Sequence, residues 1–414
     1  MPILFVPKAI RDVYFLFKDI FADHNYGYLD ACSILLFFLT GSDYFCQHVR
    51  NCPWSPSVST LSRLSKSFNP NRFMRRNRER IFKFLNSKNH ADFCFAVDDT
   101  SNPKYGSQLS FSSYFGRSGS QTYFGQKILV LVIVDLKTKI SYPISYCFLT
   151  SKKDLEHIPA QTRAIDLIKE ATEYGFPPLT VTADSWFDSK EFIESVRSFG
   201  CVFAGEVKAN RLARYNINAN SFKQKLPLIF RDTVKQRLPQ NKFQKRFEKR
   251  GKAFSEKILF LSNLFIPIKI VAVYNRINGI DPFAFYATTE LTLTGARLWK
   301  FSRARWAIEV MFRDLKQSLG FGFLSAGGEG GAHMAVCIPL VLITSMRINS
   351  RDVWSVEKKD TVGTIVKKNR EFAFSRSLDL LINSPDSEKV LKLRARRSNP
   401  NQKPRNFSGE TKVA

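Results

Sequence analysis

The sequence predicts an α/β protein with a mixed-sheet core, a helical N-terminal region and a mostly β insertion within the core. Apolar residues recur at helical spacing from residue 1 to about residue 90, and short β-type runs follow from Asp92 in a βββαβα order. Residues 205–285 interrupt this order with further β-type runs. The stretch from Phe301 to Gln317 then predicts a helix, because it lacks Pro and Gly and is dominated by good helix formers.

The size and charge of the chain limit its class. Its 414 residues exceed one typical core and indicate two or three domains or subdomains. The 63 Lys and Arg residues against 36 Asp and Glu residues give a net charge of +27, which indicates a polyanionic partner, with nucleic acid first. A membrane surface is the alternative, but the longest apolar runs fall short of the roughly 18 residues of a spanning helix. The seven cysteines form no CxxC pair and indicate neither a disulfide framework nor a zinc site.

Five parts follow from these changes in texture. Residues 1–90 are expected to be a helical DNA-binding region, because nine basic residues and one acid lie between Arg63 and Lys88. An ordinary solvated basic face is the alternative. The other expected parts are 91–204, the first part of the core; 205–285, a basic β-rich insertion; 286–350, the Glu309 helix and the helix after it; and 351–414, a basic and largely disordered tail.

Two predicted strands lead into aspartates. Phe93–Val97 is followed by Asp98 and Asp99, and Leu179–Ala183 is followed by Asp184. We expect both strands to end at these acids, where α/β sheets commonly place their chemistry. Two carboxylates side by side in a mixed sheet suit a hard divalent cation. Turn capping by the aspartates is the alternative interpretation.

The predicted helix from Phe301 to Gln317 carries a third acid. Arg305, Glu309 and Lys316 are separated by four and seven residues, so they share one helical face. A solvated row of ion pairs would explain this pattern. The sharper hypothesis is that Glu309 joins the aspartates at a metal while the two cations hold phosphates.

Asp99, Asp184 and Glu309 lie in strand, strand and helix contexts, and in this respect the chain resembles bacterial insertion-sequence transposases of the aspartate-aspartate-glutamate (DDE) type. The resemblance covers about residues 92–347 and implies an RNase H-like core. More narrowly, the chain looks like group four of these transposases, whose core is interrupted by a β insertion.

The signature of that group is Tyr, two residues, Arg, three residues, Glu, six residues, Lys. Arg305, Glu309 and Lys316 match it at the right spacings, whereas Ser302 stands at the tyrosine position. By similarity with the group, Arg305 and Lys316 would clamp DNA phosphates. Trp306 could stack on a flipped base, although we favour a core position for this side chain.

The resemblance implies an enzyme that binds the ends of an insertion sequence, cleaves DNA strands and transfers the 3′-hydroxyl ends to target DNA. Asp99, Asp184 and Glu309 would hold two Mg²⁺ (or Mn²⁺) ions, with Asp98 as the alternative first ligand. Asp99 is preferred because Thr100 follows it, as in relatives. The expected partner is double-stranded DNA, both transposon ends and target, bound by a homodimer.

This interpretation also predicts a soluble protein of the bacterial cytoplasm, associated with the nucleoid and not with a membrane. Two other function classes stay open. One is another metal-dependent nuclease with an RNase H fold, and the other is a non-catalytic DNA-binding repressor derived from a transposase. The three intact acids argue against the repressor, while the departure at Ser302 favours it.

Overall fold

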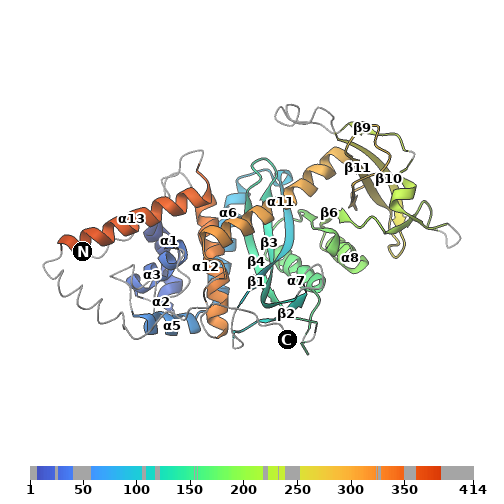
Figure 1. Ribbon diagram of the computed structural model, residues 1–414. Coiled ribbons are helices and arrows are strands. Elements are labelled where there is room, and N and C mark those ends of the chain that lie inside the picture. The colour runs from blue at the N-terminus through green and yellow to red at the C-terminus, as the bar shows by residue number, and fades with distance from the viewer. Residues whose placement is uncertain are drawn as a thin grey trace, which may run out of the picture.

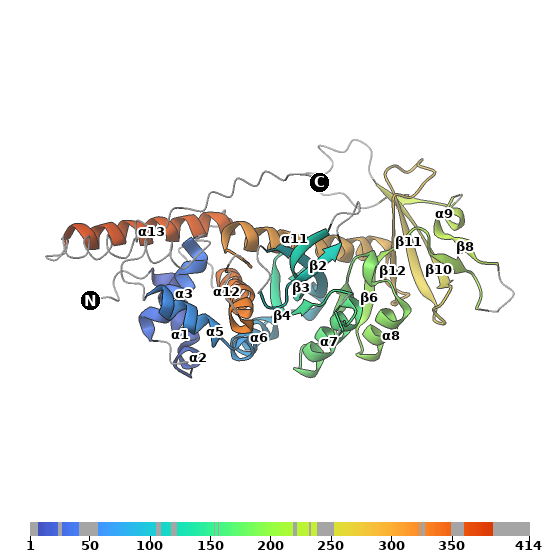
Figure 2. The ribbon, with the colours of Figure 1, turned by 60° about the horizontal axis from the view of Figure 1, so that its bottom comes forward.

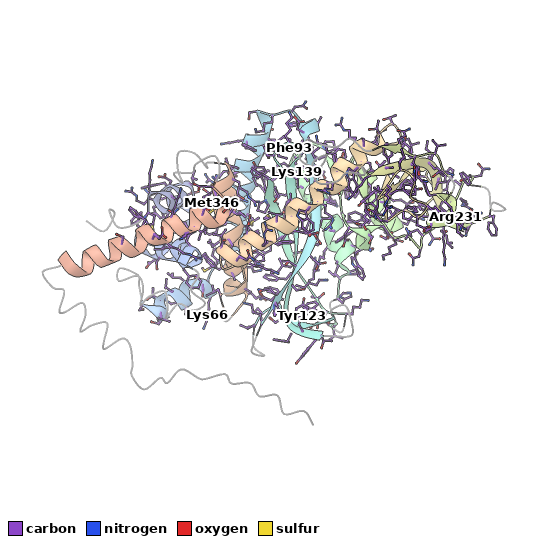
Figure 3. The ribbon with its side chains drawn as sticks, turned by 45° about the horizontal axis from the view of Figure 1, so that its top comes forward. Lys66, Phe93, Tyr123, Lys139, Arg231 and Met346 are labelled. Carbon is purple, nitrogen blue, oxygen red and sulfur yellow. The ribbon has the colours of Figure 1, made fainter. Side chains whose placement is uncertain are left out.

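The protein has a helical part, a central sheet and a β insertion arranged along one long direction (Figure 1). The computed structural model describes residues 7–23, 27–40, 57–104, 109–116, 122–152, 154–155, 157–217, 222–231, 233–237, 252–322, 324, 328–348 and 360–383. Lys66, in the helical part, and Arg231, in the insertion, lie toward opposite ends of the molecule (Figure 3).

Helices form the N-terminal part, as predicted. They are α1 (Lys8–Leu16), α2 (Lys18–Asp23), α3 (Tyr28–Thr40), α5 (Val58–Lys66) and α6 (Pro70–Asn86). Ser57 caps α5 by accepting a hydrogen bond from the Thr60 amide at 3.2 Å. Asn69 caps α6. Pro70 is tolerated as the first residue of α6, because the amide at that position has no partner within the helix.

A mixed sheet forms the core and confirms the predicted RNase H-like α/β class. Its strands are β1 (Phe93–Pro103), β2 (Ser113–Gly116), β3 (Thr122–Asp135), β4 (Ser141–Leu149), β5 (Thr180–Thr182) and β6 (Val202–Val207). Strand β1 is antiparallel to β3 and parallel to β5, and β5 is parallel to β6. The connections after β4 and β5 carry α7 (Ala160–Glu173), the short 3-10 helix η3 (Ser185–Phe187) and α8 (Lys190–Ser198).

Apolar side chains cover both faces of this sheet. Cys94 and Ala96 of β1 belong to a buried cluster that includes residues of the C-terminal helices, whereas Phe95 and Val97 belong to the cluster that includes residues of α7 and α8. A strand buried on both faces shows no polar alternation in its sequence. The alternation of side chains still decides which helix each residue of β1 faces.

The insertion continues the core sheet. It contains β7 (Leu212–Arg214), β8 (Gln224–Lys225), α9 (Leu226–Ile229), β9 (Gln236–Arg237), β10 (Ala253–Leu261), β11 (Ile268–Tyr274) and β12 (Ala284–Thr288). The twelve strands of the described chain run in the order β2-β3-β1-β5-β6-β12-β11-β10-β7-β8, with β4 on β3 and β9 on β10. Strand β12 pairs with β6 and places Tyr286 opposite Glu206. The inserted strands thus cover the core edge, which would otherwise expose unpaired backbone groups.

Two long helices complete the core. Helix α11 (Gly295–Ser318) runs from the insertion across the sheet, and α12 (Glu329–Ile348) lies between the sheet and the N-terminal helices (Figure 2). Among the described residues, one helix, α12, is long enough and apolar enough to cross a membrane. However, 83% of its most apolar 18-residue window is buried inside the protein. Its composition therefore matches that of a central core helix.

Strand β1 is longer than predicted. It does not end at the two aspartates but continues to Pro103, which pairs with Gly125 of β3. The long partner strand keeps the ladder intact past the acids, so local turn signals do not end the strand. Asp98 and Asp99 therefore lie within β1.

The C-terminal region 351–414 also differs from the expected disordered tail. Val362–Asn383 forms helix α13, in which Ile365 and Val366 are buried, and the Arg370 guanidinium donates to the Ser318 carbonyl at 3.0 Å. This short apolar stripe is weak in sequence and is buried because α11 and α3 lie against α13. The most basic stretch, residues 389–405, lies outside the described residues.

Gly330 allows α12 to approach α5 closely. A Cβ atom at this position would lie 2.4 Å from the Lys66 carbonyl oxygen, which cannot move without shifting α5. We expect Gly330→Ala to lower the free energy of unfolding by about 1–3 kcal/mol, the usual cost of overpacking. Gly363→Ala in α13 is the matched control, since its Cβ would meet nothing closer than 3.5 Å and helix propensity alone favours alanine. Urea unfolding of the two variants measures the difference, and equal stabilisation by both would contradict the tight contact.

Candidate active site

Asp184 lies two residues past the end of β5, at the carboxyl end of a parallel strand. It caps η3 through its carboxylate, which accepts a hydrogen bond from the Trp186 amide at 2.9 Å. Strand β5 is the parallel neighbour of β1, with Thr182 opposite Ala96. The two strands therefore bring Asp184 beside the acids of β1, and the capping interpretation describes only one of its contacts.

The two acids of β1 point to opposite faces of the sheet. Asp98 continues the row of Cys94 and Ala96 toward α11, and its carboxylate lies 2.9 Å from the Arg305 guanidinium. Asp99 continues the opposite row and pairs with Lys127 at 3.0 Å. The structure thus places the less favoured Asp98, and not Asp99, against the helix that carries the third acid.

Arg305 joins the strand to the helix. One end of its guanidinium contacts Asp98, and the other end contacts Glu309 of the same helix at 2.7 Å. Burial opposes the charge of Arg305, but the carboxylates of Asp98, Glu309, Asp184 and Glu206 together raise its pKa. Arg305 is therefore the central cation of a cluster of carboxylates.

The carboxyl groups of β1 carry perturbed protonation equilibria. Burial raises the pKa of Asp98 to about 7, although the charge of Arg305 opposes this shift, and the nearby Asp184 and Asp99 add to it. Burial also raises the pKa of Asp99, and the nearby charge of Lys127 makes this rise smaller. Perturbed carboxyl groups of this kind are concentrated at functional sites.

Lys316, one turn from the end of α11, reaches β1. Its ammonium group donates to the Ser101 carbonyl at 2.6 Å, and its charge lowers the pKa of Asp99. Of the three residues predicted to share one face of the helix, Arg305 and Lys316 contact β1, and Glu309 contacts Arg305. Lys316 fixes the helix on the strand, while Arg305 contacts the acids.

A cavity of about 370 Å³ opens beside Arg305. Its lining residues come from β6, β12, α11 and the residue after β5, and are Ala183, Glu206, Tyr286, Ser302, Arg303, Arg305 and Trp306. Trp306 is 60% exposed, so the core position that we favoured for it is wrong. Its helical neighbours Ala307 and Ile308 are the buried ones, because α11 turns residue 306 away from the sheet.

The sequence did not reveal Glu206, Tyr286 or Arg303 as residues of this cavity. The predicted insertion, 205–285, included Glu206 and ended just before Tyr286. Pairing of β6 with β12 instead places the two residues opposite each other at the edge of the core sheet. Glu206 lies two residues after Ala204 in β6, so the two side chains share one face of the strand. Ala204 belongs to the buried cluster that includes residues of α11, and strand periodicity therefore directs Glu206 toward this helix.

The sequence of residues 90–338 matches the family described as "Transposase DDE domain". The chain belongs to this family. A similar solved structure is the piggyBac transposase synaptic complex with hairpin DNA, which is 12% identical with a TM-score of 0.45, over 90% of this chain and 75% of that chain. No curated protein matches the sequence. The resemblance to DDE transposases is confirmed, and the narrower assignment to group four stays a prediction.

DDE transposases generally use divalent metal ions, and the donor set of this transposase fits them. Carboxylate oxygens are the ligands that Mg²⁺ and Mn²⁺ prefer. Among the residues that the structure describes, however, no three such side chains lie close enough to hold one ion as they stand. Glu309 is paired with Arg305 and Asp99 with Lys127, so these pairs must open before the carboxylates can share a cation.

The protonation of Asp98 predicts how ion binding by the transposase depends on pH. Because the pKa of folded Asp98 is raised to about 7, the group is neutral below that pH and negative above it. We expect stabilisation of the protein by Mg²⁺ to increase as the pH rises through 7, measured as the shift in Tm with and without the ion. Asp98→Asn should remove this step, and an identical pH profile in that variant would exclude Asp98 as its source.

Proposed function

We propose that this transposase cleaves DNA at the ends of an insertion sequence and joins the 3′-hydroxyl ends to target DNA at the site around Arg305. The observation that supports it best is the contact of Arg305 with Asp98 of β1 and Glu309 of α11, next to Asp184. Carboxylates from two strands and one helix suit the chemistry that the family carries out. A single exposed ion pair on a helix would not gather acids from three elements.

The metal ligands in this proposal are Asp184, Glu309 and one aspartate of β1. Asp99 remains the choice from sequence, and the contact with Arg305 favours Asp98. Divalent ions bound by these carboxylates would activate the attacking water or 3′-hydroxyl and stabilise the leaving oxygen. The protein supplies the acids on rigid elements, so the reacting groups are held in a fixed position.

Arg305 and Lys316 are proposed to bind the phosphates on either side of the reacting bond. A guanidinium has two hydrogen-bonding edges, so Arg305 can exchange one carboxylate for a phosphate and keep the other. Lys316 contacts the Ser101 carbonyl, and its charge acts on Asp99, away from Arg305. DNA would therefore meet a cation at each end of the acid cluster.

Trp306 and the cavity beside it are proposed to take an unpaired base near the cut. The indole is exposed, and Arg303 and Arg305 line the same cavity, so a base could stack while its phosphate is neutralised. Double-stranded DNA is the proposed partner, bound by a homodimer, and the net charge of +27 supports a polyanionic ligand.

Glu309→Gln separates the enzyme from a binding protein. The change keeps size and helix propensity but removes the charge that binds the cation, so Mg²⁺-dependent nicking of DNA carrying the element's own ends should fall by several orders of magnitude. Binding in a gel shift should persist, because it depends on Lys and Arg residues elsewhere. Glu371→Gln, which removes an exposed carboxylate 3.9 Å from Lys367 in α13, is the matched control and should cleave normally. Equal nicking by Glu309→Gln would reject the role of Glu309, and an inactive wild type would favour a repressor.

Asp98→Asn and Asp99→Asn identify the ligand on β1. Both variants keep the size of the side chain. Asp98→Asn removes the charge that pairs with Arg305, and Asp99→Asn removes the charge that pairs with Lys127. We expect the variant of the true ligand to lose nicking by several orders of magnitude and the other to keep activity within about tenfold. Equal and small losses in both variants would exclude a ligand on this strand.

A further inference from the structure

A second exposed indole follows Asp184, and no part of the proposed reaction uses it. Trp186 is 52% exposed, whereas its neighbour Phe187 is 1% exposed and fills the core. The turn η3 thus buries one ring and leaves the larger one in solvent. A large exposed ring beside an active site often marks a binding surface.

We propose that Trp186, Lys208, Lys190 and Phe265 form a ledge that binds unpaired nucleotides of the DNA strand at the acid cluster. The inference rests on the proposed function and adds to it a binding site for single-stranded DNA. Each half of the ledge is an aromatic ring with a lysine over it. Rings of this kind stack on bases of any sequence, and the lysines neutralise phosphates.

The first half of the ledge is fixed to the site. The Trp186 amide donates to Asp184 at 2.9 Å, and the Trp186 carbonyl accepts a hydrogen bond from the Gln161 side chain. The ammonium group of Lys208 lies 5.5 Å from the centre of the indole ring. A base stacked on Trp186 would therefore lie within two residues of a proposed metal ligand, without loss of backbone freedom on binding.

Asp188 makes this half rigid. Its carboxylate accepts from the Lys208 amide at 3.1 Å, and its carbonyl accepts from the Arg211 guanidinium at 2.7 Å. These bonds tie the end of β6 to the loop between η3 and α8. Partly buried hydrogen bonds of Asp188, in addition to the cation–π contact, therefore hold the segment of Lys208 close to the segment of Trp186.

The second half lies where the insertion meets α8. Phe265, between β10 and β11, is 61% exposed, and the ammonium group of Lys190 lies 5.2 Å from its ring centre. Lys190 also lies 4.0 Å from Glu194, a long and exposed ion pair that holds it weakly. The ledge thus links the core to the insertion through two similar ring and lysine units.

Unpaired DNA fits this surface better than duplex DNA or a protein. In a duplex the faces of the bases are already stacked, so exposed rings gain little from it. The paired lysines favour a polyanion over an apolar protein surface. Under the proposed function, strands cut and joined beside Asp184 would present unpaired nucleotides close to Trp186.

The test compares two duplexes of arbitrary sequence, one blunt and one with a single-stranded extension of about four nucleotides carrying 2-aminopurine. Binding is measured by fluorescence with EDTA present, so cleavage cannot contribute. We expect Trp186→Ala with Phe265→Ala to weaken binding of the extended duplex at least about tenfold and to reduce quenching of 2-aminopurine, with blunt-duplex binding unchanged. Trp186→Phe should keep most of the affinity, because the ring remains.

Tyr114→Ala is the control, since Tyr114 is an aromatic residue of similar exposure, 64%, but lies in β2. If the double variant loses equal affinity for both duplexes, or loses none, the ledge is rejected. It is also rejected if the variant changes its oligomeric state but keeps the preference for the extended duplex, because that result would indicate a protein interface. Glu309→Gln should keep the preference for the extended duplex. A wild type that cleaves without this preference rejects the ledge alone, whereas one that shows the preference but never cleaves rejects the proposed function alone.

Discussion

The placement of Arg305 between β1 and α11 is the interaction on which the site depends. Four carboxylates act on its guanidinium, and without a cation their mutual repulsion would oppose the packing of the helix on the strand. The apolar residues Ala304, Ile308 and Met311 bury the rest of that contact. Hydrophobic packing thus sets the distance between the two elements, and the ion pairs set which polar groups face each other across it.

Helix α11 is held at both ends by parts of the chain distant in sequence. At its start, the Gly295 amide donates to Glu256 of β10 at 2.9 Å. Past its end, Asn102 of β1 donates to the Gly322 carbonyl at 3.0 Å, and a Cβ at Gly322 would clash with this side chain. The insertion therefore helps to hold the helix that carries Arg305 and Glu309.

The sequence identified the elements but not all of their contacts. Helix periodicity and spacing placed Arg305, Glu309 and Lys316 on one face. Arg305 and Lys316 reach β1, and Glu309 pairs with Arg305. Two predictions failed because each depended on a distant partner: β3 extends β1 past the aspartates, and α11 buries part of α13. Glu206 was missed because only strand pairing across the insertion brings it to the site. Patterns along the chain report local structure, whereas these features are set by which elements meet.

The serine at the signature tyrosine position has a structural counterpart in the same cavity. Tyr286 of β12 and Ser302 of α11 line this cavity together, and the Ser302 hydroxyl donates to the Trp299 carbonyl at 3.0 Å. A tyrosine at position 302 would compete with Tyr286 for this space. The small serine of α11 and the tyrosine of β12 therefore share one cavity with Arg305.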